Sequence, residues 1–117
     1  MVDVLIVEDD PMVAEINRGY LERTPGFRLA GIASDSATAR EHLNGSGISL
    51  VLLDITMPGM DGLSFLREIR DSRPGVDVIM VTASNSSPDV QTALRLGIAD
   101  YIVKPFTAET LKQKIDK

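Results

Sequence analysis

The 117-residue chain contains no cysteine, a single histidine and no long apolar run. The absence of cysteine excludes disulfide bonds and thiolate metal sites, and it leaves the redox compartment open. No apolar stretch approaches the roughly 20 residues that a membrane-spanning helix needs. Because the first residues lead straight into an apolar strand pattern, we expect no signal peptide and a cytoplasmic location.

The chain has fewer positively charged than negatively charged residues. The chain has 12 Lys and Arg residues against 17 Asp and Glu residues, which gives a net charge of -5. A protein that binds the phosphate backbone of nucleic acids needs clustered Lys and Arg. We therefore expect no direct nucleic-acid binding and no membrane association by this chain. The single histidine, His42, falls on a polar helix face without a partner motif, and we interpret it as a solvated residue.

Apolar strand patterns alternate with helical patterns along the whole sequence. Strands are predicted at residues 4–7, 27–33, 48–53, 76–81 and 100–103. Asp10 and Pro11 are a favoured cap and first residue for the first helix, in which Val13, Ile16 and Leu21 recur at helical spacing. The alternation predicts a single α/β domain over residues 1–117, with a five-stranded parallel sheet and helices on both faces.

Two strand orders are plausible for such a doubly wound sheet. In the flavodoxin-like order 2-1-3-4-5, the first and third strands are neighbours at the switch point, where ligands bind. Glu8 and Asp9 follow the first of these strands, and Asp54 follows the apolar run of the third. Acidic residues at these two strand ends favour the 2-1-3-4-5 order, which brings Asp9 beside Asp54.

Carboxylates on adjacent strands, about 4.8 Å apart, repel one another, and each disfavours ionisation of the next. A hard divalent cation removes that cost, and Mg²⁺ takes carboxylate oxygens while it keeps several waters. The sequence therefore predicts an acidic, Mg²⁺-binding pocket at this edge of the sheet. Lys104, which follows the fifth strand, adds a cation at the end of another strand.

Four motifs together resemble the receiver domain of bacterial response regulators. They are VEDD at residues 7–10, LDITMPGMDG at 53–62, VTA at 81–83 and YIVKPF at 101–106. Each motif alone is weakly specific, but four in order with the right strand context are highly specific, and they cover essentially the whole chain. Residues 25–27 and 98–101 are similar to the branch that regulates citrate and dicarboxylate use, whose members carry a helix-turn-helix output.

The resemblance implies a role for each acidic residue of the predicted pocket. Asp54 is expected to be the phosphoacceptor, which forms an aspartyl phosphate. Mg²⁺ is expected to contact Asp54 and Asp9 directly, Glu8 through water, and the backbone carbonyl of Thr56. Asp10, which precedes a proline, is better interpreted as a helix cap than as a ligand.

Three further residues complete the expected switch. Lys104 is expected to contact the pocket and later a phosphoryl oxygen, and the resemblance implies a cis peptide bond between Lys104 and Pro105. The hydroxyl of Thr82 is expected to reach the phosphoryl group, and the ring of Tyr101 to turn inward behind it. A surface lysine and an ordinary half-buried strand tyrosine are the open alternatives for Lys104 and Tyr101.

The implied function is a signalling receiver that assists its own phosphorylation and dephosphorylation, and not an enzyme that turns over an external substrate. Its expected partners are a cognate sensor histidine kinase and, on phosphorylation, a second copy that docks through the fourth helix, fifth strand and fifth helix. The expected output is transcription through a DNA-binding domain that is not present in this chain.

Three other functions compete with this interpretation. A phosphohydrolase of the haloacid dehalogenase type also uses a strand-end Asp and Mg²⁺, but it needs a second Asp where this chain has Thr56. A flavodoxin-like flavin carrier needs a hydroxyl- and glycine-rich loop after the first strand, where the acidic residues 8–10 would repel the flavin phosphate. A degenerate receiver that binds partners without phosphorylation is not supported, because every position that carries the resemblance is filled.

Overall fold

The computed structural model describes residues 2–45, 47–55, 61–82, 88–104 and 108–115 of the chain. Within them, the strands are β1 (Val2–Val7), β2 (Phe27–Ala33), β3 (Leu50–Asp54), β4 (Asp77–Thr82) and β5 (Asp100–Val103). The helices are α1 (Pro11–Glu22), α2 (Ser36–Gly45), α3 (Gly62–Ser72), α4 (Pro88–Leu96) and α5 (Ala108–Ile115). The strands form one parallel sheet in the order β2-β1-β3-β4-β5, which confirms the predicted flavodoxin-like order.

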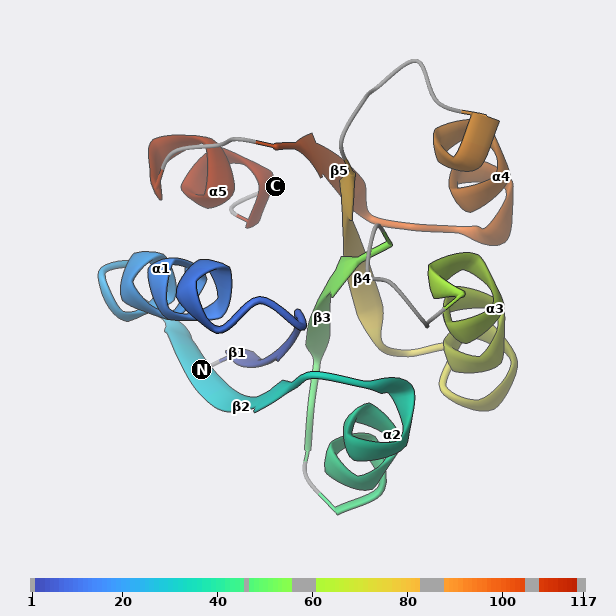
Figure 1. The fold of residues 1–117 in the computed structure, drawn as a ribbon, viewed down its shortest axis with the longest axis horizontal. Coiled ribbons are helices and arrows are strands. Elements are labelled where there is room, and N and C mark those ends of the chain that lie inside the picture. Colours follow the sequence, from blue (N-terminus) through green and yellow to red (C-terminus); the bar gives the residue numbers. More distant parts are fainter. Residues whose placement is uncertain (1, 46, 56–60, 83–87, 105–107, 116–117) are drawn as a thin grey trace.

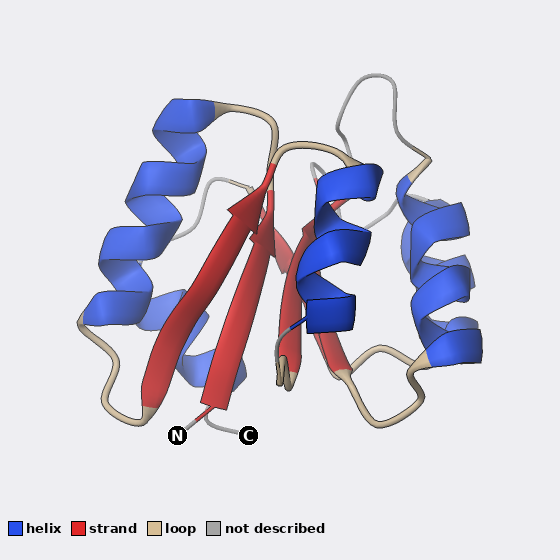
Figure 2. Cartoon of the chain, turned by 90° about the horizontal axis from the view of Figure 1, so that it is seen from below, coloured by secondary structure: helices blue, strands red, loops and turns tan. Residues whose placement is uncertain are grey.

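Helices cover both faces of this sheet. α1 and α5 lie on one face, and α2, α3 and α4 lie on the other (Figure 1). Figure 2 shows the strands enclosed between these helical layers. Strands that are covered on both faces read as continuous apolar runs, and β3 is buried along its whole length. None of the helices in the described ranges is both long enough and apolar enough to cross a bilayer.

The strand ends differ from the prediction in a way that matters for the site. β2 and β5 match their predicted bounds, but β3 and β4 each end one residue later than predicted. Asp54 pairs with Val81 and Thr82 pairs with Val103 in the parallel ladders. Asp54 and Thr82 are therefore strand residues that the sheet holds in place. The sequence predicts instead that Asp54 follows its strand.

The predicted apolar face of α1 is partly wrong. Ile16 is 46% exposed, and the buried residues of the helix are Ala14, Asn17 and Leu21. These three also recur at helical spacing, but a small alanine and a polar asparagine carry no hydrophobic signal. Tertiary packing therefore buries a face of α1 that only partly matches the pattern of large apolar residues.

The interpretation of His42 as a solvated residue is only partly right. Its side chain is half-buried, and its ring lies against Gly31 of the neighbouring strand β2. A Cβ atom at Gly31 would lie 2.5 Å from Cε1 of His42, so a larger residue there would displace the ring. The contact joins α2 to β2, and a lone histidine on a polar helix face gives no sign of it in the sequence.

α3 begins directly beside the end of β3. Asp61 caps the helix, because its Oδ1 accepts the backbone N–H groups of Leu63 and Ser64 at 3.1 Å each. Gly62 is buried, and a Cβ atom there would lie 2.7 Å from Cα of Ile55. This close approach requires a glycine, and it fixes α3 against the residue that follows Asp54.

We predict that Gly62→Ala lowers the free energy of unfolding by about 1–3 kcal/mol, because the new methyl group overpacks against backbone that cannot move aside cheaply. Gly19→Ala in α1 is the control, since a Cβ atom there meets nothing within 4 Å. That variant should gain roughly 0.5–1 kcal/mol, the usual cost of glycine inside a helix. Urea unfolding measures both values, and a Gly62→Ala protein as stable as the wild type would contradict the close approach.

Candidate functional site

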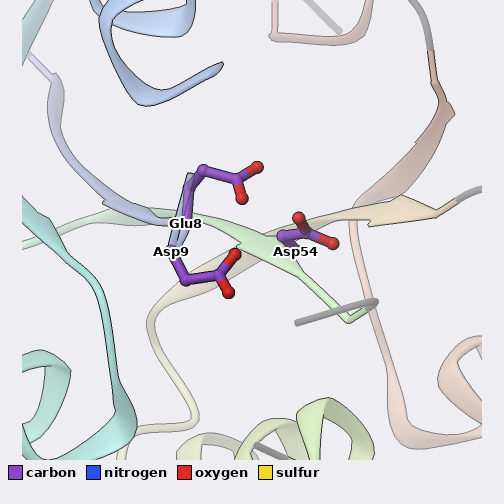
Figure 3. Close-up of side chains that lie close together, drawn as sticks. All are labelled: Glu8, Asp9 and Asp54. Atoms are coloured by element: carbon purple, nitrogen blue, oxygen red, sulfur yellow. The ribbon is translucent and has the colours of Figure 1, made fainter. Parts of the chain in front are cut away.

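Three carboxylates meet where β1 and β3 end. Glu8 and Asp9 follow β1, and Asp54 is the last residue of β3. Val7 pairs with Leu53 across the two strands, so the residues that follow them are neighbours. One carboxylate oxygen from each of Glu8, Asp9 and Asp54 lies within 4.8 Å of the others. Figure 3 shows the three side chains extending from the two adjacent strand ends.

Burial differs among these carboxylates. The side chains of Glu8 and Asp54 are each only 3% exposed, whereas Asp9 is exposed. Lys104, which follows β5, reaches into the cluster with its Nζ 2.6 Å from Oδ2 of Asp54 and 3.4 Å from Oε1 of Glu8. The sequence-predicted contact between Lys104 and the acidic pocket is therefore present in the structure.

The pocket perturbs the protonation of its members. Burial is the largest influence on Glu8, and together with a hydrogen bond to Asp54 it raises the pKa of Glu8 from 4.5 to about 7. Burial would lower the pKa of Lys104, but the hydrogen bond to Asp54 and the two negative charges outweigh it and raise that pKa above its ordinary value. Lys104 is thus a cation at neutral pH, while Glu8 carries a proton in part of the molecules.

Thr82 and Tyr101 lie on the next two strands. Thr82 is the last residue of β4 and is 2% exposed. Like Asp54, it lies at the edge of the sheet where the parallel strands end. Tyr101 pairs with Met80, two residues further from that edge, and it packs half-buried against the core on the side of α3 and α4. Thr82 therefore directly follows the ladder partner of Asp54, and Tyr101 lies two residues before the partner of Thr82 on β5.

The comparisons with known proteins agree with this geometry. Residues 4–116 match the sequence profile described as "Response regulator receiver domain". This chain belongs to the receiver domain family. The probable C4-dicarboxylate response regulator DctR of Halalkalibacterium halodurans is 45% identical over 112 residues, which cover 96% of this chain and 49% of that protein. The transcriptional regulatory protein MalR of Bacillus subtilis is 48% identical over 109 residues, which cover 93% of this chain and 46% of that protein.

This receiver domain spans about half the length of these curated relatives. Among solved structures, a CheY-like receiver domain protein of Methanospirillum hungatei matches with a TM-score of 0.88 and 30% identity, over 99% of this chain and 91% of that one. The family indicated by the four motifs and the fold class predicted from the strand–helix alternation are both confirmed. The names of the relatives also agree with the predicted citrate and dicarboxylate branch.

The oxygen ligands of this receiver domain fit a hard divalent cation. The candidate ligand atoms of the three carboxylates are all oxygens, and oxygen-only ligand sets bind hard cations such as Mg²⁺ and Ca²⁺. Thr56 and Pro105 lie outside the described residues, so the Thr56 carbonyl ligand and the cis Lys104–Pro105 bond stay predictions.

One contact near Tyr101 has no counterpart in the sequence motifs. Nζ of Lys114, in α5, lies 3.3 Å from Oδ1 of Asp100 and 5.7 Å from the centroid of the Tyr101 ring. The residues are far enough apart in the chain that no local spacing signals the contact. Only the packing of α5 beside β5 brings them together.

Glu8 should make the metal-free protein less stable as the pH rises from about 4.5 to about 7. Because its pKa is higher in the folded than in the unfolded protein, the folded state binds more protons in this range. The stabilisation that the folded state gains from protonated Glu8 is complete below pH 4.5 and is lost as the pH passes about 7. Unfolding free energies in EDTA should depend less on pH in Glu8→Gln. The exposed control Glu41→Gln should keep the wild-type dependence of unfolding free energy on pH. The same dependence in Glu8→Gln would contradict a raised pKa of Glu8 as its cause.

Proposed function

We propose that this receiver domain, over residues 1–117, is a phosphorylation switch in which Asp54 accepts a phosphoryl group from a sensor histidine kinase. The contact of 2.6 Å between Lys104 Nζ and Asp54 Oδ2, inside a carboxylate cluster, carries the proposal. A buried carboxylate at a rigid strand end is a positioned nucleophile. The adjacent ammonium group is placed to offset the charge that develops on the transferring group.

Mg²⁺ is the proposed cofactor, with Asp9 and Asp54 as direct ligands, Glu8 as a ligand through water and the carbonyl of Thr56 as a further ligand. The support is the close approach of the three carboxylates and their hard oxygen donors. When bound, Mg²⁺ neutralises negative charge on phosphoryl oxygens. Exposure of Asp9 leaves the cluster accessible to solvent on that side.

Asp54, Lys104 and Thr82 have separate roles in the proposed transfer. An oxygen of Asp54 bonds to phosphorus while the bond between phosphorus and the donor imidazole nitrogen breaks, so the receiver gains one phosphoryl group and the donor regains its histidine. Lys104 holds the Asp54 carboxylate through Oδ2 before transfer. After transfer, Lys104 and the hydroxyl of Thr82 bind phosphoryl oxygens.

Phosphorylation replaces the single negative charge of the Asp54 carboxylate by a phosphoryl group that carries between one and two negative charges. Thr82 moves toward that charge, and the ring of Tyr101 turns inward behind it. The surface of α4, β5 and α5 transmits the change and forms a homodimer. Leu94 supports this role, because it is 49% exposed on α4 while Val90 and Ala93 of the same helix face the core.

The output of the switch is proposed to be transcription, through a DNA-binding domain outside this chain. The relatives named as a C4-dicarboxylate response regulator and as a transcriptional regulatory protein support this output and a dicarboxylate stimulus. The receiver itself makes no direct contact with nucleic acid in this proposal, consistent with its net charge of -5. A cytoplasmic location follows from the same function.

Incubation with acetyl phosphate and Mg²⁺ should add one phosphoryl mass to the wild-type protein, because Asp54 attacks any donor with a good leaving group. Intact-protein mass spectrometry should find no gain in Asp54→Asn and none in the wild type with EDTA. Asp10→Asn is the matched control and should be labelled normally, since Asp10 caps α1 through the N–H groups of Met12 and Val13. Labelling of Asp54→Asn would place the acceptor elsewhere.

A further inference from the structure

Lys114, in α5, lies beside the ring of Tyr101, the proposed switch residue. Its Nζ is 5.7 Å from the ring centroid of Tyr101, within the range of about 6 Å in which a cation is attracted to an aromatic face. The same Nζ is 3.3 Å from Oδ1 of Asp100, and that oxygen also accepts the backbone N–H of Tyr101 at 2.8 Å. One carboxylate thus joins the backbone of Tyr101 to the ammonium group beside its ring.

The contact depends on where the ring lies. α5 covers one face of the sheet, opposite α3 and α4 (Figure 1). Tyr101 packs against the core cluster on the side of α3 and α4. Lys114 reaches the ring because β5 is an edge strand in the described sheet. The contact joins elements on opposite faces of the sheet, so it lasts only while the ring stays near Lys114.

The group is partly removed from water, which strengthens such a contact. The side chains of Lys114 and Asp100 are 30% and 12% exposed. Charges in this position are screened less by salt than fully exposed ones. Because Asp100 already holds the ammonium group, little additional side-chain freedom is lost when the ring packs beneath it.

We propose that Lys114 is a positioning residue that holds the Tyr101 ring at the outer edge of the sheet in the unphosphorylated receiver. The inference rests on the proposed function, in which the ring turns inward on phosphorylation. That rotation takes the ring away from Lys114, while the Lys114–Asp100 pair persists. A contact made in one state only shifts the equilibrium by its own free energy, and a contact of this kind corresponds to about a two- to five-fold shift.

The tyrosine content allows a direct test. The chain has two tyrosines, Tyr20 and Tyr101, so protein labelled with 3-fluorotyrosine gives two ¹⁹F NMR signals, which Tyr20→Phe assigns. The spectra are recorded for the wild type, Lys114→Met, Lys114→Arg and Lys112→Met. Each protein is then titrated with beryllofluoride and Mg²⁺, where beryllofluoride stands in for the phosphoryl group on Asp54.

Lys114→Met should move the Tyr101 signal and leave that of Tyr20 in place, and it should strengthen the apparent beryllofluoride affinity about two- to five-fold. Lys112→Met removes the same charge from an exposed position of the same helix. Loss of a positive charge alone weakens anion binding, so this control should bind beryllofluoride no better than the wild type. Lys114→Arg should behave as the wild type, because a guanidinium group both pairs with carboxylates and stacks on rings.

Two results would overturn the role of Lys114 alone: an unmoved Tyr101 signal in Lys114→Met, or a beryllofluoride affinity equal to that of Lys112→Met. Either result, with normal beryllofluoride binding by the wild type, leaves the phosphorylation switch standing. If the wild-type protein bound no beryllofluoride in the presence of Mg²⁺, the proposed function would fail, and the role of Lys114 with it.

Discussion

The pairing of β1 with β3 is the constraint on which the site depends, because it forces Glu8, Asp9 and Asp54 into one cluster. Their mutual repulsion would separate them in water, yet the apolar strands that carry them are buried and cannot shift. The ammonium group of Lys104 offsets part of this repulsion, and burial raises the pKa of Glu8 to about 7. In the proposed function, this cluster binds a cation and receives a phosphoryl group.

Backbone hydrogen bonds hold the functional residues at the strand ends. The N–H of Glu8 donates to Ala33, and the N–H of Lys104 donates to Thr82, at 2.9 and 2.8 Å. Such bonds keep the residues of the cluster in register with the sheet. In the proposed switch, charge at Asp54 acts on Lys104 and Thr82, and the contact with Lys114 opposes the inward turn of the Tyr101 ring.

The strand order and the acidic cluster could be predicted, because apolar runs mark buried strands and carboxylates stood at the ends of two of them. The buried face of α1 could not, since Ala14 and Asn17 give no hydrophobic signal. The contact of His42 with Gly31, and that of Lys114 with Tyr101, join distant elements and depend on packing alone. Sequence patterns report which face of an element is apolar, but they do not report which side chains meet across two elements.

The melting temperature as a function of Mg²⁺ concentration tests the central claim that these carboxylates form one cation site. A ligand that binds only the folded state stabilises it by RT ln(1 + [L]/Kd). At constant ionic strength, the melting temperature of the wild type and of Asp10→Asn should rise with Mg²⁺, and that of Asp9→Asn should stay almost unchanged. An equal rise in Asp9→Asn would show that the cation binds elsewhere and would contradict the account.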